Sequence, residues 1–439
     1  MSGLVLKAGL VIDPVAQTAQ VADVRVRGAK VVEVDARLDA DGDEIIDCGG
    51  LWVMPGFVDL HTHLREPGGE DAEDIATGSA AGAAGGYTAL SPMANTSPVC
   101  DSPAVAELVM RRGNEVGLVD LFPVGAITRG TRGDELSEFG ALRACAAAVD
   151  MFSDDGHPVT DALVMRRALQ YASAFDAVIC NHSEERALTS DAQMNEGAVS
   201  SVLGLAGWPH EAEETMVARD LILAEGLGAR LHVPHVSCAG TVELLRAARA
   251  RGVRVTAEVT PHHLTLDETL VASFDPNLKV NPPLRTRADI DALRGALADG
   301  TIDAVATDHA PHPPEQKEQE WEHAPCGMLG LETAFSVLVT ELVDELDDTD
   351  GRGLTLPTLV ARFTTGPASV RDVRGHGGAI AAGGDANVTV VDPDARWTVE
   401  ARRLQSRARN TAYEGRKLVS RPVHTLLRGR FTLRSGQVT

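Results

Sequence analysis

The stretch Pro55-Gly-Phe-Val-Asp-Leu-His-Thr-His63 is an apolar segment that ends in two histidines. Residues i and i+2 of a strand face the same side, so the His61 and His63 imidazoles can reach one ion. Polar ligands at the end of a strand are typical of barrel enzymes, which build their sites at the carboxyl ends of parallel strands. Because an isolated HxH pair is often incidental, the prediction of a metal site depends on the rest of the chain.

Four further apolar runs end in residues that bind metals. In chain order they are Phe152-Ser-Asp-Asp155, Ala177-Val-Ile-Cys-Asn-His182, Leu231-His-Val-Pro-His235 and Ala304-Val-Ala-Thr-Asp-His309. Each histidine can instead cap its strand by a backbone hydrogen bond, but five such endings in succession favour one shared site. Four histidines and two aspartates form a ligand set for one or two divalent ions, with zinc as the first candidate.

A two-metal site needs a bridging anion, and the sequence offers the carboxylate of Asp154 or Asp155. Two metals sharing a hydroxide generate a nucleophile at neutral pH and polarise the carbonyl group that it attacks. Asp308 can bind one metal, accept the proton of the water and deliver it to a leaving nitrogen. The pattern therefore predicts hydrolysis of an amide-like bond.

The centre of the chain alternates short apolar runs with Ala-rich segments of helical period. Runs at residues 87–90, 177–180, 231–233 and 303–306 predict strands, and residues 163–172 and 239–250 predict helices. Ser102-Pro103 is a helix start, because proline is favoured at the first helical position. Alternating β and α units over some 300 residues favour a parallel barrel or a doubly wound sheet.

Both ends of the chain have a different, β-rich pattern. Residues 4–52 contain short β-branched runs separated by turn signals, which predict antiparallel strands. The same pattern returns at residues 386–391 and 423–427. We therefore expect a small β domain from residues 1–54 and 375–439, and a catalytic domain from residues 55–374.

The amino-acid composition argues against several classes of binding partner. The 439 residues are 44% hydrophobic and 23% charged, with a net charge of −23, which repels nucleic acid and anionic lipid. No run of residues is long and apolar enough to cross a bilayer, and the N-terminus lacks the features of a signal peptide. The six cysteines show no CxxC pair. We expect a cytoplasmic protein in which any anionic substrate meets a locally positive site.

Seven motifs follow one another along nearly the whole chain. They are His61-Thr-His-Leu-Arg-Glu-Pro-Gly68, Met93-Ala-Asn-Thr96, Phe152-Ser-Asp-Asp-Gly156, Val259-Thr-Pro-His-His-Leu264, Lys279-Val-Asn-Pro-Pro-Leu284, Ala306-Thr-Asp-His-Ala-Pro-His312 and Ala324-Pro-Cys-Gly-Met-Leu-Gly-Leu-Glu-Thr333. Together they resemble the dihydroorotases of the amidohydrolase superfamily. The resemblance is to the longer bacterial class, which has an aspartate where many relatives carry a carboxylated lysine.

This resemblance implies a (β/α)8 TIM barrel with a β-sandwich built from both termini. It also implies the zinc-dependent interconversion of (S)-dihydroorotate and N-carbamoyl-L-aspartate in pyrimidine biosynthesis, with two zinc ions expected per chain. By motif, His61 and His63 match ligands of the first zinc, and His182 and His235 match ligands of the second. Asp155 matches the bridging carboxylate, which leaves Asp154 as a neighbouring or turn residue. Asp308 matches both a ligand and the general acid/base.

The resemblance further implies a set of substrate-binding residues. Arg65 can hold the substrate carboxylate with its planar fork, helped by Asn95 and His312. The alternative for Arg65 is a salt bridge to Glu66 or Glu70. Of the remaining matches, His63 lies beside the substrate and Asn281 lies at the edge of the pyrimidine ring. Cys326 and Gly327 match a backbone contact to the ring. Asn281, Cys326 and Gly327 can also be ordinary loop residues.

Two other functions remain open at this point. The first is another cyclic amidohydrolase, a dihydropyrimidinase, hydantoinase or allantoinase, although those relatives usually carry the carboxylated lysine in place of Asp155. The second is an inactive dihydroorotase-like scaffold for aspartate carbamoyltransferase, which is expected to lose metal ligands, whereas all six candidates are present. A homo-oligomer and association with aspartate carbamoyltransferase also stay open. Residues 312–325 are either a mobile lid or a solvated connection.

Overall fold

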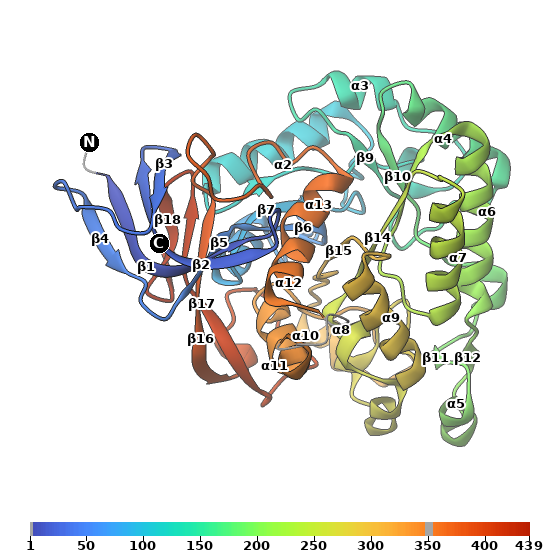
Figure 1. The fold of residues 1–439 in the computed structure, drawn as a ribbon. Coiled ribbons are helices and arrows are strands. Elements are labelled where there is room, and N and C mark those ends of the chain that lie inside the picture. The colour runs from blue at the N-terminus through green and yellow to red at the C-terminus, as the bar shows by residue number, and fades with distance from the viewer. Residues whose placement is uncertain (1–2, 347–353) are drawn as a thin grey trace.

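The computed structural model describes residues 3–346 and 354–439. Figure 1 shows two parts, a sheet domain that contains both termini and a larger body in which helices surround short strands. The strands of the larger body are β6 (Phe57–Thr62), β7 (Tyr87–Pro92), β8 (Asp120–Leu121), β9 (Met151–Phe152), β10 (Val178–Cys180), β13 (Arg230–Val233), β14 (Val255–Val259) and β15 (Ala304–Val305).

These eight strands belong to two parallel sheets. One sheet has the order β6-β7-β8 and the other the order β15-β14-β13-β10-β9, and every strand pair within them is parallel. Isolated parallel bridges join the sheets at both edges, between Gly125 and Phe152 and between Thr62 and His309. The carboxyl ends of all eight strands therefore lie at the same end of the body.

Helices follow the strands, as the alternating pattern predicts. The main ones are α1 (Ile75–Ala84), α2 (Pro103–Val116), α3 (Phe139–Ala144), α4 (Ala162–Ser173), α6 (Glu211–Leu227), α7 (Ala239–Ala250), α9 (Arg287–Asp299), α11 (Ala334–Leu346), α12 (Leu356–Phe363) and α13 (Thr365–Val370). The predicted helices at 163–172 and 239–250 are confirmed as α4 and α7.

Local sequence explains where these helices begin and end. Ser102 is the N-cap of α2 and Pro103 its first residue, as predicted, and Gly117 ends the helix at φ 69°. The Asp161 side chain accepts hydrogen bonds from the backbone amides of Leu163 and Val164 at the start of α4. Such caps provide partners for the backbone groups that a helix terminus leaves free.

The strands from both ends of the chain form one nine-stranded sheet, β19-β18-β17-β16-β5-β1-β2-β3, with β4 beside β1. In Figure 1 the blue N-terminal strands lie beside the red C-terminal ones. The strands are β1 (Leu4–Asp13), β2 (Thr18–Arg27), β3 (Lys30–Asp35), β4 (Glu44–Asp47), β5 (Trp52–Pro55), β16 (Val388–Thr398), β17 (Lys417–Leu427), β18 (Arg430–Arg434) and β19 (Gln437–Val438). The expected sheet domain from both termini is present, and its division into the layers of a sandwich stays a prediction.

One detail of the N-terminal prediction was wrong. The strands of residues 4–52 are not all antiparallel, because β4 and β5 pair with β1 in parallel, whereas β1-β2 and β2-β3 are antiparallel hairpins. A tight turn enforces antiparallel pairing, but the longer connections before β4 and β5 let the chain return in the same direction as β1.

The core of the larger body packs the start of β6 against its last helices. The Phe57 ring lies 4.9 Å from Phe335 of α11 and 5.1 Å from Phe363 of α12, between ring centroids. Shorter elements complete the fold: β11 (Met194–Asn195), β12 (Gly207–Trp208), α5 (Ala198–Leu203), α8 (Pro261–Thr265) and α10 (Pro314–Lys317). Within residues 3–346 and 354–439, no helix has the length and apolar character needed to cross a membrane.

Candidate active site

The six predicted metal ligands lie at the carboxyl ends of five strands. His61 is in β6 and His63 directly follows it, while the other four follow the ends of β9, β10, β13 and β15 by two or three residues. Because neighbouring parallel strands end at the same level, these side chains converge although their sequence positions span residues 61–308. The set is His61, His63, Asp155, His182, His235 and Asp308, and all of them are buried.

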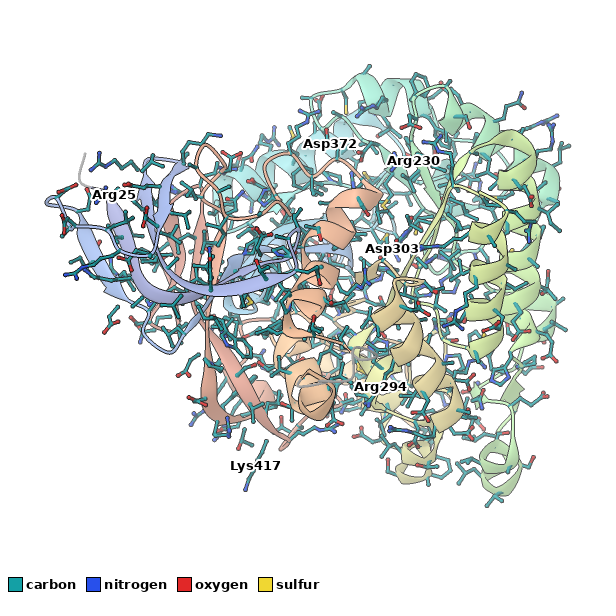
Figure 2. All side chains as sticks on the ribbon, viewed as in Figure 1. Arg25, Arg230, Arg294, Asp303, Asp372 and Lys417 are labelled. Carbon is teal, nitrogen blue, oxygen red and sulfur yellow. The ribbon has the colours of Figure 1, made fainter. Side chains whose placement is uncertain are left out.

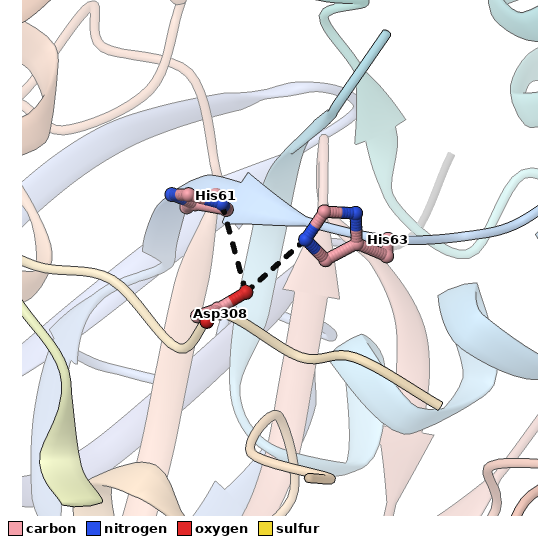
Figure 3. Close-up of side chains that lie close together, drawn as sticks. All are labelled: His61, His63 and Asp308. Carbon is pink, nitrogen blue, oxygen red and sulfur yellow. Dashed lines mark hydrogen bonds and ion pairs between the residues drawn. The ribbon is translucent and has the colours of Figure 1, made fainter. Parts of the chain in front are cut away.

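One group of ligands contains His61, His63 and Asp308 (Figure 3). The Asp308 Oδ1 lies 3.1 Å from the His63 Nε2 and 3.6 Å from the His61 Nε2. Burial raises the pKa of Asp308, but the positive charge of His61 and the contact with His63 more than offset this and hold the pKa well below its usual range. Asp308 is therefore an ionised carboxylate at neutral pH and can accept a proton.

The second group is centred on Asp155. Its Oδ1 lies 3.4 Å from the His61 Nε2, 3.4 Å from the His182 Nδ1 and 3.5 Å from the His235 Nε2, and its Oδ2 lies 3.3 Å from the His63 Nε2. Burial raises the pKa of Asp155, whereas the surrounding histidines lower it well below its usual range. Asp155 thus contacts members of both predicted metal sites, which suits a bridging ligand.

The donor atoms fit a divalent metal ion. The His61 Nε2 and the Asp155 Oδ1 are fully buried and have no hydrogen-bond partner among the described residues. Buried polar atoms nearly always have a partner, so atoms left without one need an explanation. Imidazole nitrogens and carboxylate oxygens within 4.8 Å of one another form a donor set suited to a zinc-like ion.

Asp154 and Asp155 have different environments. The Asp154 Oδ1 accepts a hydrogen bond from the Thr128 backbone amide at 3.0 Å, so this carboxylate holds the loop that begins at Thr128. Burial raises the pKa of Asp154 to about 6. The choice of Asp155 over Asp154 as the residue that meets the histidines agrees with this geometry.

Glu258 is a site residue that the sequence analysis missed. This fully buried residue of β14 contacts the His61 Nδ1 at 2.8 Å and the His232 Nε2 at 3.1 Å. Burial raises its pKa, but the two histidines hold it at about 2, so Glu258 is an acceptor and His61 Nδ1–H must donate. In the neutral ring that can bind a metal, the His61 Nε2 is then the unprotonated nitrogen, and it faces Asp155. A glutamate inside the apolar run of β14 was the available signal.

The other histidines near the site do not join the two ligand groups. His263 lies between the Thr260 hydroxyl at 2.7 Å and the Pro282 carbonyl at 3.0 Å. The His309 Nδ1 accepts from the Gly330 amide at 3.2 Å. His262 is buried, and burial lowers its pKa well below its usual value. His263 and His309 thus form hydrogen bonds outside the two ligand groups, and the His262 ring packs against His263 with 4.6 Å between the ring centroids.

A cavity of about 180 Å³ opens onto this centre. Its walls contain every predicted substrate-binding residue, including His63. They also contain three further predicted metal ligands, Asp155, His182 and Asp308. The lining residues are His63, Arg65, Asn95, Asp155, Gly156, His182, Asn281, Asp308, Ala310, His312, Cys326 and Gly327.

Arg65 lines the cavity and does not pair with the neighbouring acidic residues. Its Nε donates to the Pro311 carbonyl at 3.1 Å, and it forms no ion pair with any of the residues that the structure describes. Glu66 pairs with Arg112 at 3.0 Å, and Glu70 accepts from the Gly68 amide. The alternative of a salt bridge from Arg65 to Glu66 or Glu70 is therefore wrong.

Two amide side chains of the cavity are linked to the predicted metal ligands. The Asn95 Oδ1 lies 3.0 Å from the His63 Nδ1. The Asn281 Nδ2 donates to the Glu184 Oε2 at 3.1 Å, and that carboxylate also lies 3.2 Å from the His182 Nε2. Glu184 was missed by the sequence analysis, and it connects Asn281 to His182.

The wall opposite the metal ligands is held by main-chain contacts. The His312 Nε2–H donates to the Cys326 carbonyl at 2.7 Å, and the Gly327 amide donates to the Lys279 carbonyl at 2.8 Å. Burial and then the nearby charges of Arg65 and Lys317 lower the pKa of His312 to about 3. His312 is therefore neutral at pH 7, and its Nδ1 remains an acceptor.

Asn410, from the C-terminal part of the chain, holds the same wall and was also missed. Its Oδ1 accepts from the His312 amide at 3.1 Å, and its Nδ2 donates to the Ala310 carbonyl at 3.0 Å and the Gly327 carbonyl at 3.1 Å. All three partners line the cavity. Nothing in the local sequence around Asn410 indicates this role.

Three site residues have left-handed backbone. Arg65 has φ 61°, His235 has φ 32° and Asp308 has φ 46°. Such conformations cost non-glycine residues about 1–3 kcal/mol each, and they persist where surrounding contacts enforce them. Backbone strain is thus concentrated where the side chains must point into the cavity.

The sequence is similar to those of known proteins. Residues 50–240 match the family model described as "Dihydro-orotase-like". A dihydroorotase of Streptomyces coelicolor is 52% identical over 418 residues, covering 95% of this chain and 96% of its own. Dihydroorotases of Mycobacterium tuberculosis (51%, covering 95% of this chain and 96% of that one) and Pelotomaculum thermopropionicum (46%, covering 98% of both) are also similar.

Solved structures give the same fold. An L-hydantoinase of Arthrobacter aurescens superposes with a TM-score of 0.87 at 26% identity, over 100% of this chain and 98% of that one. A dihydropyrimidinase of Brevibacillus agri superposes with a TM-score of 0.83 at 24% identity, over 100% and 96% of the two chains. The fold and the site thus define a cyclic amide hydrolase of the amidohydrolase type. Within that class, identities near 50% over nearly the full length show that the chain belongs to the dihydroorotase family.

Proposed function

We propose that this chain catalyses the reversible hydrolysis of the cyclic amide of (S)-dihydroorotate to N-carbamoyl-L-aspartate, a step of pyrimidine biosynthesis. One observation carries the proposal: Arg65, whose guanidinium has no acidic partner among the described residues, lines the same cavity as the His/Asp centre. The centre suits amide hydrolysis, and the guanidinium suits a ring that bears a carboxylate.

Two zinc ions are the proposed cofactor. His61, His63 and Asp308 would hold one ion, His182 and His235 the other, and Asp155 would bridge them. Zinc at such a centre supplies Lewis acidity and lowers the pKa of bound water toward neutrality. The buried His61 Nε2 and Asp155 Oδ1, which have no hydrogen-bond partner in the described parts of the chain, support this assignment.

Asp308 is the proposed general acid and base. Its ionised carboxylate, 3.1 Å from the His63 Nε2, can accept the proton of the attacking water. The amide C–N bond of the ring then breaks, and Asp308 returns the proton to the ring nitrogen. In the reverse direction the same carboxylate removes a proton from the ureido nitrogen before ring closure.

The substrate would lie with its carboxylate toward Arg65, Asn95 and His312. The guanidinium offers two parallel donors to a carboxylate, whereas the N–H of the neutral His312 already donates to the Cys326 carbonyl, so His312 shapes the wall beside the carboxylate. Asn281, Cys326 and Gly327 would contact the pyrimidine ring. In this orientation the amide carbonyl of the ring faces Asp155, Asp308 and the histidines.

For the architecture, we infer a closed (β/α)8 barrel of residues 55–374 with a β-sandwich from residues 1–54 and 375–439. The two isolated bridges at the edges of the parallel sheets support closure. A cytoplasmic location, a homo-oligomer and association with aspartate carbamoyltransferase stay predictions. Sedimentation of the purified chain, alone and with that enzyme, tests the last two.

The first experiment measures ureido-product formation by the zinc-supplemented protein on L-dihydroorotate, dihydrouracil, hydantoin and allantoin, with bound metal counted on the same sample. We expect turnover of dihydroorotate and little of the three uncharged rings. Preferential hydrolysis of the uncharged rings would contradict the proposal. Bound metal without any turnover would indicate an enzyme that depends on a missing partner chain.

A further inference from the structure

Two of the five lysines of the chain are buried behind the cavity. The lysines are Lys7, Lys30, Lys279, Lys317 and Lys417, and Lys279 and Lys317 are 7% and 2% exposed. Lysine is almost never fully buried unless it is paired, because a buried charge is costly without a partner. Neither ammonium forms an ion pair with a carboxylate in residues 3–346 and 354–439, so their placement needs an explanation.

Both ammonium groups donate to main-chain carbonyls of the segment that forms one wall of the cavity. The Lys279 Nζ donates to the Trp321 carbonyl at 2.6 Å and the Glu322 carbonyl at 3.2 Å. The Lys317 Nζ donates to the Pro325 carbonyl at 2.7 Å and the Lys279 carbonyl at 3.2 Å. The two lysines are thus joined to each other and to the residue before Cys326.

These contacts place two positive charges next to the residues that line the cavity. The Lys279 carbonyl also accepts the Gly327 amide at 2.8 Å, and Lys317 and His312 line a second, smaller cavity. Burial lowers the pKa of Lys317 to about 8, with a further decrease from the charge of Lys279. Lys317 is therefore mainly protonated at pH 7.

Main-chain carbonyls satisfy the hydrogen bonds of an ammonium but carry no net charge to balance it. With a net charge of −23, the chain has ample acids, yet none pairs with these two lysines among the described residues. An anionic ligand in the adjoining cavity would supply the missing negative charge, because Coulomb attraction is strong where water is excluded. An uncharged ring would gain nothing from the pair.

We propose that Lys279 and Lys317 form a buried cation pair that makes the cavity select a carboxylate-bearing ring over an uncharged one. This inference rests on the proposed function for the identity of the ring. The lysines act through the wall of His312, Cys326 and Gly327, so they are positioning and specificity residues and do not touch the reacting atoms. The pair supplements Arg65, which is the direct partner of the carboxylate.

The test compares two planar rings that differ by one carboxylate, orotate and uracil, in calorimetric binding to the metal-loaded protein. Lys279→Gln and Lys317→Gln keep a hydrogen-bond donor but remove the charge, whereas Lys317→Arg keeps the charge. Lys417→Gln is the matched control, because the exposed Lys417 side chain projects from the start of β17 in the terminal sheet (Figure 2). The KM and kcat for dihydroorotate are measured on the same variants.

We expect each glutamine variant to weaken orotate binding and to raise the KM for dihydroorotate about tenfold, with uracil binding and kcat changed by no more than about twofold. Lys317→Arg should retain the affinity for orotate, and Lys417→Gln should change nothing. Equal weakening of orotate and uracil would overturn the proposal, because it would show that the lysines only hold the shape of the wall. Unchanged orotate affinity in both glutamine variants would overturn it as well.

The unmodified protein gives a check that needs no variant to fold. Orotate must bind at least about tenfold more tightly than uracil, and equal affinities would refute a cavity that selects a carboxylate. If the protein binds orotate selectively and the glutamine variants lose this preference, but dihydroorotate is not hydrolysed, the proposed function fails and the cation pair stands. The two proposals can therefore fail separately.

Discussion

Glu258 and His61 are 197 positions apart in the chain and are joined by a buried hydrogen bond of 2.8 Å between the His61 Nδ1 and the Glu258 Oε1. In the neutral, metal-binding form of His61 this bond determines which ring nitrogen carries the proton, and it directs the other nitrogen toward Asp155 and Asp308. Carboxylates that contact a metal-binding histidine in this way orient the ring and raise its basicity.

We predict that Glu258→Gln lowers zinc affinity about 10- to 100-fold, because the neutral amide holds the His61 ring and its tautomer less firmly. Metal content after dialysis against graded concentrations of a chelator measures the change. Asp154→Asn is the control, since Asp154 is as fully buried as Glu258 but faces the Thr128 loop. Identical zinc retention in Glu258→Gln and the unmodified protein would show that Glu258 does not orient the ligand.

Asp308→Asn should reduce kcat on dihydroorotate about 10²- to 10⁴-fold, because the amide cannot accept the proton of the attacking water. Single-turnover kinetics and circular dichroism, with zinc counted, separate loss of chemistry from loss of fold or metal. Turnover at the normal rate by the zinc-loaded variant would reject Asp308 as the proton carrier.

Arg65→Ala should raise the KM for dihydroorotate about 10- to 100-fold, as expected for loss of a charge-assisted, bidentate contact. Arg65→Lys should recover only part of the affinity, because an ammonium lacks the planar fork. Arg112→Ala serves as a control that removes a guanidinium already paired with Glu66. An unchanged KM in Arg65→Ala would refute the carboxylate clamp.

Asn410→Asp should weaken substrate binding, because a carboxylate would face the carbonyls of Ala310 and Gly327, which the amide now binds at 3.0 and 3.1 Å. Asn387→Asp is a matched control: Asn387 is equally buried and bridges Gly375 and Arg428 of the terminal part of the chain. Steady-state KM and urea unfolding are measured for both. We expect both to lose stability and only Asn410→Asp to raise the KM; an equal KM in both would exclude a role for Asn410 in the cavity wall.

The free energy of unfolding should decrease on acidification because of His263. Burial lowers its pKa from the usual 6.5 to about 4, so between these values the unfolded chain binds a proton that the folded chain does not. The contribution of His263 to the free energy of unfolding is therefore lost as the pH falls from 6.5 to 4. At pH 5 this loss amounts to about 2 kcal/mol. His263→Gln should remove that part of the slope in urea unfolding of the metal-free protein at pH 7 and 5. Parallel pH profiles for both proteins would contradict the assignment.

Much of the architecture followed from local patterns. Apolar runs ending in His or Asp identified β6, β9, β10, β13 and β15 and located the six candidate ligands, because strand ends in a parallel sheet share one edge. Helix starts such as Ser102-Pro103 were also visible in the sequence, since capping is a property of neighbouring residues. The parallel pairing of β4 and β5 with β1 could not be predicted from the sequence, because it depends on long connections.

The sequence by itself thus determined the order of β and α units, the ligand types and their convergence. Only the tertiary structure decided which buried groups support the site: Glu258 on His61, Asn410 on the cavity wall, and the Lys279–Lys317 pair behind it. Lys279 begins one of the seven motifs, but no local pattern indicates the role of Lys279 or of the other three residues. Their roles come from hydrogen bonds between segments far apart in the chain, and periodicity carries no information about such contacts.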